Sequence, residues 1–297
     1  MKLPARFAIG AATHTGLVRG ANEDDYLIVA PDPSVSFLVV AVADGLGGTA
    51  GGAEASRTGL RAFAVAALDE STAEPEQRMR IGFENASRSV QQQAALVPAL
   101  RGMATTLVAA AFTQNGIVIG HVGDSRAYLA RGGSLRRLTE DHATKEDRNR
   151  LLRCIGSGAS QSPDVTSLEL KDGDRVVLCT DGVWGSVPES AVTESLGGRD
   201  PQAAASRLVA AALQRGGPDN ATAVVVDVVA IAAGGEAAEV NLPNEEGPPQ
   251  ENLARPGRLG APRWPVVLLV AAVLLGIAAA LRAAFDFDVF AWVASVI

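Results

Sequence analysis

Short, almost continuously apolar runs are the feature that most limits how this chain can fold. Each has the length of a β-strand and is bounded by Gly, Asp or Asn. The runs cover residues 36–43, 104–112, 116–122, 174–180 and 221–229. Because strands without a polar face need apolar cover on both sides, two sheets that pack against each other would satisfy them.

Segments with helical periodicity could supply the outer cover. They are residues 51–68, 76–96, 188–196 and 201–214. Two of these segments lie in the first half of the chain and two in the second, so each sheet can receive its own pair. The order predicts a helix-sheet-sheet-helix sandwich.

Acidic residues stand at the ends of four apolar runs, beside glycine or asparagine. They are Asp44, Asp124, Asp181 and Asp219. An isolated Asp-Gly pair is usually a turn, and we expect Asp172-Gly173 to be a hairpin tip. Four carboxylates at one rim, however, could not all stay ionised without a cation, and Mg²⁺ and Mn²⁺ prefer oxygen ligands. The pattern therefore predicts a site for hard cations.

Charge and cysteine content argue against two other kinds of site. The formal net charge of −7 gives no broad cationic field, so we expect no nucleic-acid partner. The two cysteines, Cys154 and Cys179, form no C-x-x-C pair, and the three histidines are scattered at 14, 121 and 142. No zinc site is predicted, and two isolated cysteines favour a reducing cytosol.

The C-terminal part departs from this pattern. We expect a globular domain over residues 1–231, followed by a flexible linker of Gly, Pro, Glu, Asn and Ala over residues 232–263. Residues 264–282 are apolar and uncharged before the closing Arg282. They are just long enough to span a bilayer, although a buried core helix has a similar composition. We predict a transmembrane helix and, over residues 283–297, a short extracytoplasmic tail.

The charges that flank this span predict its orientation. Arg255, Arg258 and Arg263 precede it, whereas Arg282 is followed by Asp286 and Asp288. By the positive-inside rule, the large N-terminal part stays in the cytoplasm.

A series of motifs resembles the PPM (PP2C-like) metal-dependent Ser/Thr protein phosphatases. In chain order they are T-G-L-V-R-G-A-N-E-D (15–24), A-D-G-L-G-G (43–48), M-A-T-T-L (103–107), H-V-G-D-S-R-A-Y (121–128), L-T-E-D-H (138–142), R-N-R-L-L-R-C-I-G (148–156), L-C-T-D-G-V-W (178–184) and G-G-P-D-N-A-T (216–222). The resemblance covers roughly residues 6–230. It implies an α+β fold, a four-layer α-β-β-α sandwich with a metal centre between two antiparallel sheets.

The resemblance also implies a ligand set for two Mn²⁺ or Mg²⁺ ions. Asp44 would bridge both ions, the carbonyl of Gly45 would bind one, and Asp181 and Asp219 would bind the other. Asp124 matches the ligand of a weaker third ion, although it could equally be a strand-end cap.

Three further residues match functional positions of the family. Glu23 and Asp24 correspond to an acidic pair that supports the first ion, one of them through water, and the sequence leaves open which one ligates directly. Arg19 corresponds to the phosphate-binding arginine, so Arg19 and Asp44 are the expected catalytic residues. A solvated loop arginine is the alternative for Arg19.

These residues together imply the hydrolysis of phosphoserine and phosphothreonine in proteins by a metal-activated water. The expected partners are phosphorylated proteins, including a Ser/Thr kinase whose signalling is reversed, and the lipid bilayer. The expected location is the bacterial inner membrane, with a single span and a cytoplasmic catalytic domain. The alternatives are a pseudophosphatase adaptor that binds phosphoproteins and a phosphatase for a small metabolite or an anti-anti-sigma-type protein.

The chain departs from the family pattern in two places. Leu46 stands where many eukaryotic members carry a histidine proposed to protonate the leaving group, so water must supply that proton. Only residues 143–148 separate D-H from N-R-L-L-R, which predicts a shortened flap over the cleft. We expect His142 to be a structural, hydrogen-bonding residue.

Overall fold

The computed structural model describes most of the N-terminal part of the chain. The described residues are 5–29, 38–68, 74–113, 116–144, 151–157, 162–231 and 240–241. The chain divides into two units, residues 1–253 and 254–297, and every described residue belongs to the first. The predicted transmembrane helix and tail, residues 264–297, therefore lie outside the described residues. Within the described part, no helix is long and apolar enough to cross a membrane.

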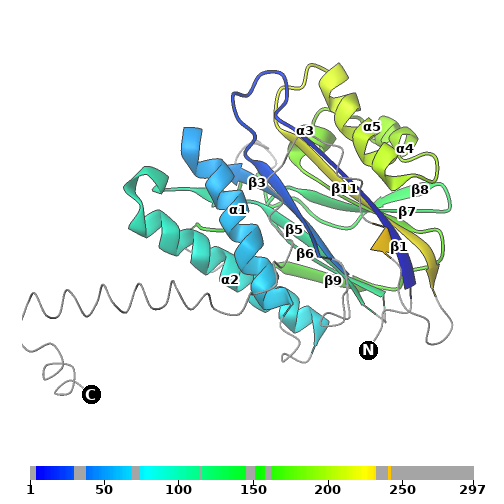
Figure 1. Ribbon diagram of the computed structural model, residues 1–297, viewed down its shortest axis with the longest axis horizontal. Helices are drawn as coiled ribbons and strands as arrows, with labels where there is room; N and C mark the ends of the chain where they lie inside the picture. The colour runs from blue at the N-terminus through cyan, green and yellow to red at the C-terminus, as the bar shows by residue number, and fades with distance from the viewer. Residues whose placement is uncertain are drawn as a thin grey trace, which may run out of the picture. The chain divides into compact units, whose positions relative to one another are not determined.

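One sheet, here called the first sheet, has six strands in the order β12-β1-β11-β10-β7-β8. Their bounds are β1 Ala5–His14, β7 Arg126–Arg131, β8 Ser134–Arg137, β10 Arg175–Cys179, β11 Ala221–Ile231 and β12 Val240–Asn241. All pairs are antiparallel except β1 with β12. Figure 1 shows β1 and β11 side by side, and His14 pairs with Ala221. The loop after β1 therefore begins beside Asp219.

The second sheet has the strand order β2-β3-β5-β6-β9, and β4 pairs with the end of β3. Its strands are β2 Asp24–Val29, β3 Leu38–Leu46, β4 Ala104–Thr105, β5 Leu107–Thr113, β6 Gly116–Val122 and β9 Asp164–Leu168. The antiparallel register of β2 and β3 places Asp24 opposite Asp44. Two predicted site residues are thus neighbours across a ladder.

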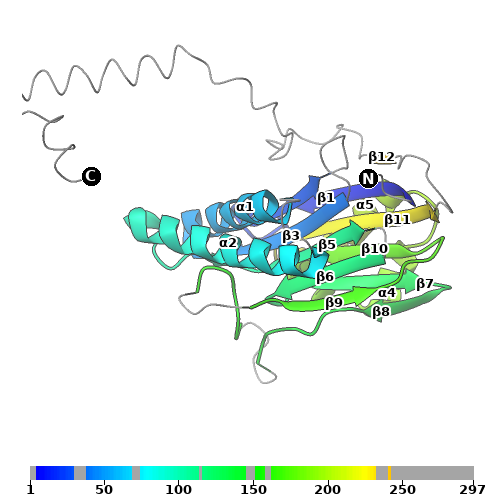
Figure 2. The ribbon, with the colours of Figure 1, turned by 90° about the horizontal axis from the view of Figure 1, so that it is seen from below.

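Helices flank the two sheets on opposite sides (Figure 1). The second sheet is covered by α1 Gly48–Ala67 and α2 Pro75–Leu96, with the short η1 Pro98–Leu100 after them; α1 and α2 lie side by side in Figure 2. The first sheet is covered by α3 Asp181–Trp184, α4 Glu189–Ser195 and α5 Pro201–Gln214. The predicted architecture is confirmed as an α+β fold of two antiparallel sheets flanked by helices.

The apolar core between the sheets is built from alternate residues of facing strands. Phe7 and Ile9 of β1 are almost fully buried there, as are Val40 of β3 and Val176 of β10. Phe7 packs edge-on against Phe112 with ring centroids 5.0 Å apart. Burial of this apolar surface, worth about 25 cal/mol per Å², joins the sheets and leaves the polar strand ends at their edges.

Several strands were not predicted, and one turn was predicted wrongly. The missed strands are β1, β2, β7, β8, β9 and β12, and β12 lies within residues 232–263, which were predicted to be a flexible linker. Asp172-Gly173 is not a hairpin tip, because the strands on either side of it, β9 and β10, lie in different sheets. Asp174 N donates to Lys171 O at 3.1 Å, so the pair forms a turn in a connection between sheets, and Gly173 takes the positive φ of 80°.

Candidate metal centre

Five carboxylates from both sheets converge at one edge of the sandwich. Asp24 begins β2, Asp44 lies near the end of β3 and Asp124 follows β6, whereas Asp181 follows β10 and Asp219 precedes β11. Burial raises the pKa of Asp44 well above its ordinary value, and the charges of the other four carboxylates raise it further. The gathering that the strand ends predict is therefore present, with Asp24 as an additional member.

The buried carboxyl groups of this cluster lack partners for some of their oxygens. Asp24 Oδ2 accepts a hydrogen bond from Thr180 Oγ1 at 2.8 Å. Asp24 Oδ1 and Asp181 Oδ1 are buried and have no hydrogen-bond partner within the described part of the chain. Burial, with the charges of Asp181 and Asp219, raises the pKa of Asp24 to about 7. Such carboxylates fit hard divalent cations, which bind oxygen and offset like charges.

Arg19 brings positive charge to the rim of this cluster. Its Nη2 donates to Asp219 Oδ2 at 2.9 Å, and 51% of its side chain remains exposed. The charge of Asp219 raises the pKa of Arg19, and those of Asp44 and Glu23 add to the effect. The guanidinium is thus held at the site and is still open to a ligand from solvent.

Asn220, next to Asp219, holds the connection between β1 and β2 that carries Arg19. Its Oδ1 accepts from Glu23 N at 2.8 Å, and its Nδ2 donates to Thr15 O at 2.7 Å and to Ala21 O at 2.9 Å. The sequence predicts no separate role for Asn220. The D-N pair at the start of a buried strand is the signal that could have indicated this structural role.

Two threonines fix the backbone of Asp44. Thr106 Oγ1 accepts from Asp44 N at 2.9 Å, and Thr106 N and Thr105 Oγ1 each donate to Asp44 O at 2.8 Å. Thr106 Oγ1 also lies 2.7 Å from Ser125 Oγ, next to Asp124. The M-A-T-T-L motif therefore holds Asp44 in place and connects it to Ser125, the neighbour of Asp124.

Glu23 and Asp24 face different neighbours. A Cβ atom on Gly52 of α1 would lie 2.6 Å from Glu23 Oε1 and 2.8 Å from Gly45 O, so both oxygens face the space beside Gly52. Asp24 instead contacts Thr180. The sequence left open which of the two acids ligates directly; in the structure it is Glu23 whose carboxylate shares this space with Gly45 O.

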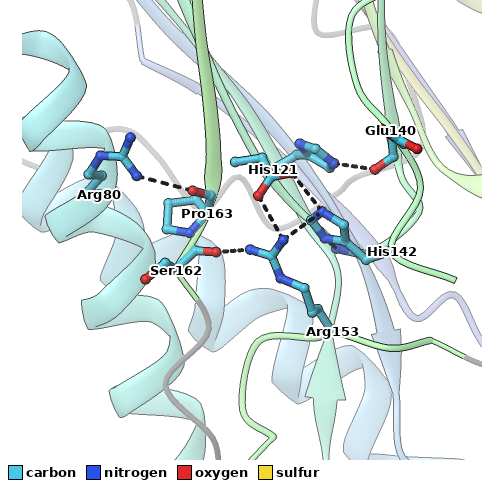
Figure 3. Close-up of polar contacts among 9 residues, drawn as sticks. Arg80, His121, Glu140, His142, Arg153, Ser162 and Pro163 are labelled. Atoms are coloured by element: carbon cyan, nitrogen blue, oxygen red, sulfur yellow. Dashed lines mark hydrogen bonds and ion pairs between the residues drawn. The ribbon is translucent and has the colours of Figure 1, made fainter.

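A second group of possible ligands lies elsewhere in the fold. His121, His142 and Asp164 place one ligand atom each within 4.8 Å of one another, and the two histidine rings stack with centroids 4.4 Å apart. The prediction of scattered histidines was therefore wrong for these two. Arg153 Nη1 lies 2.9 Å from His142 Nε2 (Figure 3) and 2.8 Å from Asp164 Oδ1. Because a guanidinium cation already occupies this position, the group forms a hydrogen-bonded network.

Comparison with known proteins agrees with the fold. The chain is 34% identical over 236 residues to the serine/threonine protein phosphatase PstP of Mycobacterium tuberculosis, covering 74% of this chain and 44% of that protein. It thus spans less than half the length of this relative. Its identity to the serine/threonine phosphatase stp of Listeria monocytogenes is 33% over 238 residues, covering 72% of this chain and 93% of that protein.

A solved structure and a family-wide pattern match the same region. The structure of the PstP catalytic domain in complex with two manganese ions has a TM-score of 0.67 and 33% sequence identity, covering 75% of this chain and 99% of that chain. The sequence model named Protein phosphatase 2C matches residues 14–229. Because this match covers well over half of the chain, the chain belongs to the protein phosphatase 2C family.

Proposed function

We propose that this protein hydrolyses phosphoserine and phosphothreonine in other proteins, in dependence on bound Mn²⁺ or Mg²⁺. The observation that carries the proposal is the convergence of Asp24, Asp44, Asp124, Asp181 and Asp219 beside Arg19. Buried oxygens without partners fit cations, and an exposed guanidinium fits a phosphate. The names of the relatives and the two manganese ions of PstP support the same function.

The ligand roles are those that the family resemblance implies, and the placement of these side chains is compatible with them. Asp44, at the centre of the cluster, would contact two ions; Asp181 and Asp219 would complete one of them. Glu23 and the Gly45 carbonyl would face the other ion, directly or through water. Asp24, adjoining Asp44 across the β2-β3 ladder, adds a further carboxylate. When bound, two such ions supply the Lewis acidity that makes a water nucleophilic near neutral pH.

Arg19 would bind and orient the phosphate. Its planar guanidinium can donate to two phosphate oxygens, and Asp219 holds one side of the group so that the remaining N–H donors face solvent. Binding there places the phosphate beside the carboxylate cluster. The same contact holds the phosphate in a fixed orientation while water attacks. Fixing the two reactants in this geometry lowers the entropic part of the barrier.

The leaving group also needs a proton. Leu46 has no ionisable group, so the proton would come from water. We assign to Asp124 the support of a third, weaker cation that makes such a water more acidic. The buried position of Asp124, which raises its pKa to about 7, agrees with a carboxylate that awaits a cation. A strand-end cap remains the alternative role.

We also propose that the enzyme is anchored in the bacterial inner membrane and reverses the action of a Ser/Thr kinase there. The apolar residues 264–282 and the arginines before them support this location. Protease added to intact spheroplasts should leave residues 1–231 intact. Degradation of this domain would show the opposite orientation.

The proposed activity is tested with the full-length protein in detergent. We expect it to hydrolyse p-nitrophenyl phosphate and phosphothreonine peptides with Mn²⁺ or Mg²⁺, and to lose both activities in EDTA. A phosphoprotein-binding adaptor would release no p-nitrophenol under any of these conditions. Panels of phosphopeptides and phosphorylated metabolites then separate a protein phosphatase from a metabolite phosphatase.

A further inference from the structure

The loop that carries Asp124, residues 123–126, is attached to the rest of the fold on both sides of that carboxylate. We call these residues the Asp124 loop. Gly123 takes a φ of 111°, and a Cβ atom there would lie 2.7 Å from the Thr106 side chain, so glycine is required. Ser125 Oγ lies 2.7 Å from Thr106 Oγ1. The loop is thus packed tightly against Thr106, which lies between β4 and β5.

Two adjacent residues, Asp141 and His142, hold the two ends of the Asp124 loop. Gly123 N donates to His142 Nδ1 at 3.1 Å, and His142 N donates to Gly123 O at 2.9 Å. At the other end, Arg126 Nε and Nη2 donate to the two carboxylate oxygens of Asp141 at 2.8 and 2.6 Å. His142 therefore satisfies both backbone groups of the residue directly before Asp124.

The ring of His142 is fixed in orientation. Because Nδ1 accepts from Gly123, the ring proton of the neutral form lies on Nε2 and can donate to Asp164 Oδ2 at 3.2 Å. Arg153 Nη1, 2.9 Å from Nε2, cannot donate to a protonated Nε2 and donates to Asp164 Oδ1 at 2.8 Å instead. The ring is buried and stacks on His121, whose Nε2 donates to Glu140 O at 2.7 Å (Figure 3). A ring held on both edges and one face can keep Gly123 in one position.

We propose that His142 is a positioning residue for Asp124. By fixing both backbone groups of Gly123, it sets the direction in which the Asp124 carboxylate enters the acidic cluster. This inference rests on the proposed function, since Asp124 must take part in catalysis for its position to matter. Ser125 and Arg126 keep their own attachments, so loss of the His142 ring should displace the carboxylate without releasing the loop.

The test compares three variants of the full-length protein. His142→Ala removes the acceptor for Gly123 N–H and should lower kcat on a phosphothreonine peptide about tenfold, as loss of an outer-shell partner commonly does. His142→Asn places an amide oxygen near the position of Nδ1 and should restore most of the rate. The control Asp164→Ala removes the exposed partner of Nε2 but leaves the Gly123 contact, and should stay near wild type.

Two further measurements separate positioning from general support of the fold. In an Asp124→Asn background, His142→Ala should cause no additional loss, because the residue acts only through Asp124. Amide hydrogen exchange at Gly123, measured by NMR without metal, should accelerate in His142→Ala and stay slow in His142→Asn. This exchange measurement does not depend on catalysis.

Each contrary outcome overturns the proposal. An equal loss from His142→Ala in both backgrounds would show a role that does not pass through Asp124, and unchanged exchange at Gly123 would remove the structural link. Full activity of Asp124→Asn would leave His142 nothing to position. Absence of any Mn²⁺-dependent activity in the wild type, with the Gly123 exchange as expected, would instead mean that the proposed function itself is wrong.

Discussion

Carboxylates lie at both ends of strands β10 and β11. They are paired with arginines at one end of these strands, whereas at the other end a buried carboxylate oxygen has no partner in the described structure. At one end, Asp227 receives Nε and Nη2 of Arg175 at 2.5 and 2.6 Å. Asp174, just before β10, receives two bonds from Arg131 at 2.7 and 2.6 Å. At the other end, Oδ1 of Asp181 is buried and has no hydrogen-bond partner within the described structure. We call these the paired end and the acidic end.

The difference in pairing suits one end to stabilising the fold and the other to binding cations. A buried carboxylate loses several kcal/mol of hydration, and a bidentate arginine offsets that cost. The paired end therefore stabilises the fold without any ligand. The acidic end keeps like charges together, at a cost in stability that a bound cation would relieve.

Removal of a carboxylate at the acidic end should have the largest effect on function. We expect Asp44→Asn and Asp181→Asn each to reduce turnover to less than about a tenth of wild type, because each removes charge that holds the metal. Both variants should melt no lower than wild type in EDTA, since they also remove a buried charge. Retention of more than a tenth of the rate in either variant would contradict the two-metal assignment.

At the paired end the same substitution should act on stability instead. Asp227→Asn leaves the buried Arg175 without its counter-charge, and we expect about 3 kcal/mol of destabilisation in urea unfolding. The rate per folded molecule, measured well below the transition, should be unchanged. A large loss of rate in Asp227→Asn at unchanged stability would show that the paired end also contributes to catalysis, contrary to the expected difference between the two ends.

The acidic end should also make the stability of the metal-free protein depend on pH. Asp124 has a pKa of about 7 in the folded protein against an ordinary value of 3.8, so the folded state binds its proton more tightly. The stability that this proton provides is complete below about pH 4 and is lost as pH rises through about 7. In EDTA, Asp124→Asn should therefore melt above wild type at pH 8, by about 4 °C, and near it at pH 5.

This comparison between variant and wild type is needed because two histidines act in the opposite direction. Burial lowers the pKa of His121 and of His142, so protonation of these residues reduces the free energy of unfolding of the protein as pH falls. Both are present in wild type and in Asp124→Asn, so their contribution cancels. An equal difference in melting temperature at pH 5 and pH 8 would argue against a raised pKa of Asp124.

The smallest effect concerns one step of the reaction. Asp124→Asn should lower the rate on a phosphothreonine peptide by about tenfold and the rate on p-nitrophenyl phosphate by less, because nitrophenolate needs little protonation as it leaves. Metal-binding calorimetry should show the first two ions still bound. Equal losses on the two substrates, with unchanged metal stoichiometry, would make Asp124 a structural cap.

The fold was predictable where strands are apolar throughout. The run at 221–229 corresponds to β11, and the periodic segment 201–214 is α5 to the residue. Strand β1 was missed because only alternate residues, such as Phe7 and Ile9, are large and apolar. Strand β9 was missed because its side chains are largely exposed polar groups at a sheet edge.

The acidic cluster was predictable because strand ends gather at sheet edges, whatever the order of the strands. The contacts that hold it were not. Asn220 reaches Thr15, about two hundred positions away in the chain, only because β1 pairs with β11. The stacking of His121 on His142 likewise depends on how the loop after β8 returns to β6, which no local pattern records.

Calorimetric titration of Mn²⁺ into the metal-free full-length protein, with one variant from each end, shows directly where the metal ions bind. We expect two or three ions per chain for wild type and for Asp227→Asn, and at least one ion fewer for Asp181→Asn. The same number of ions for all three proteins, or an equal loss in both variants, would contradict the assignment of the acidic end as the metal centre.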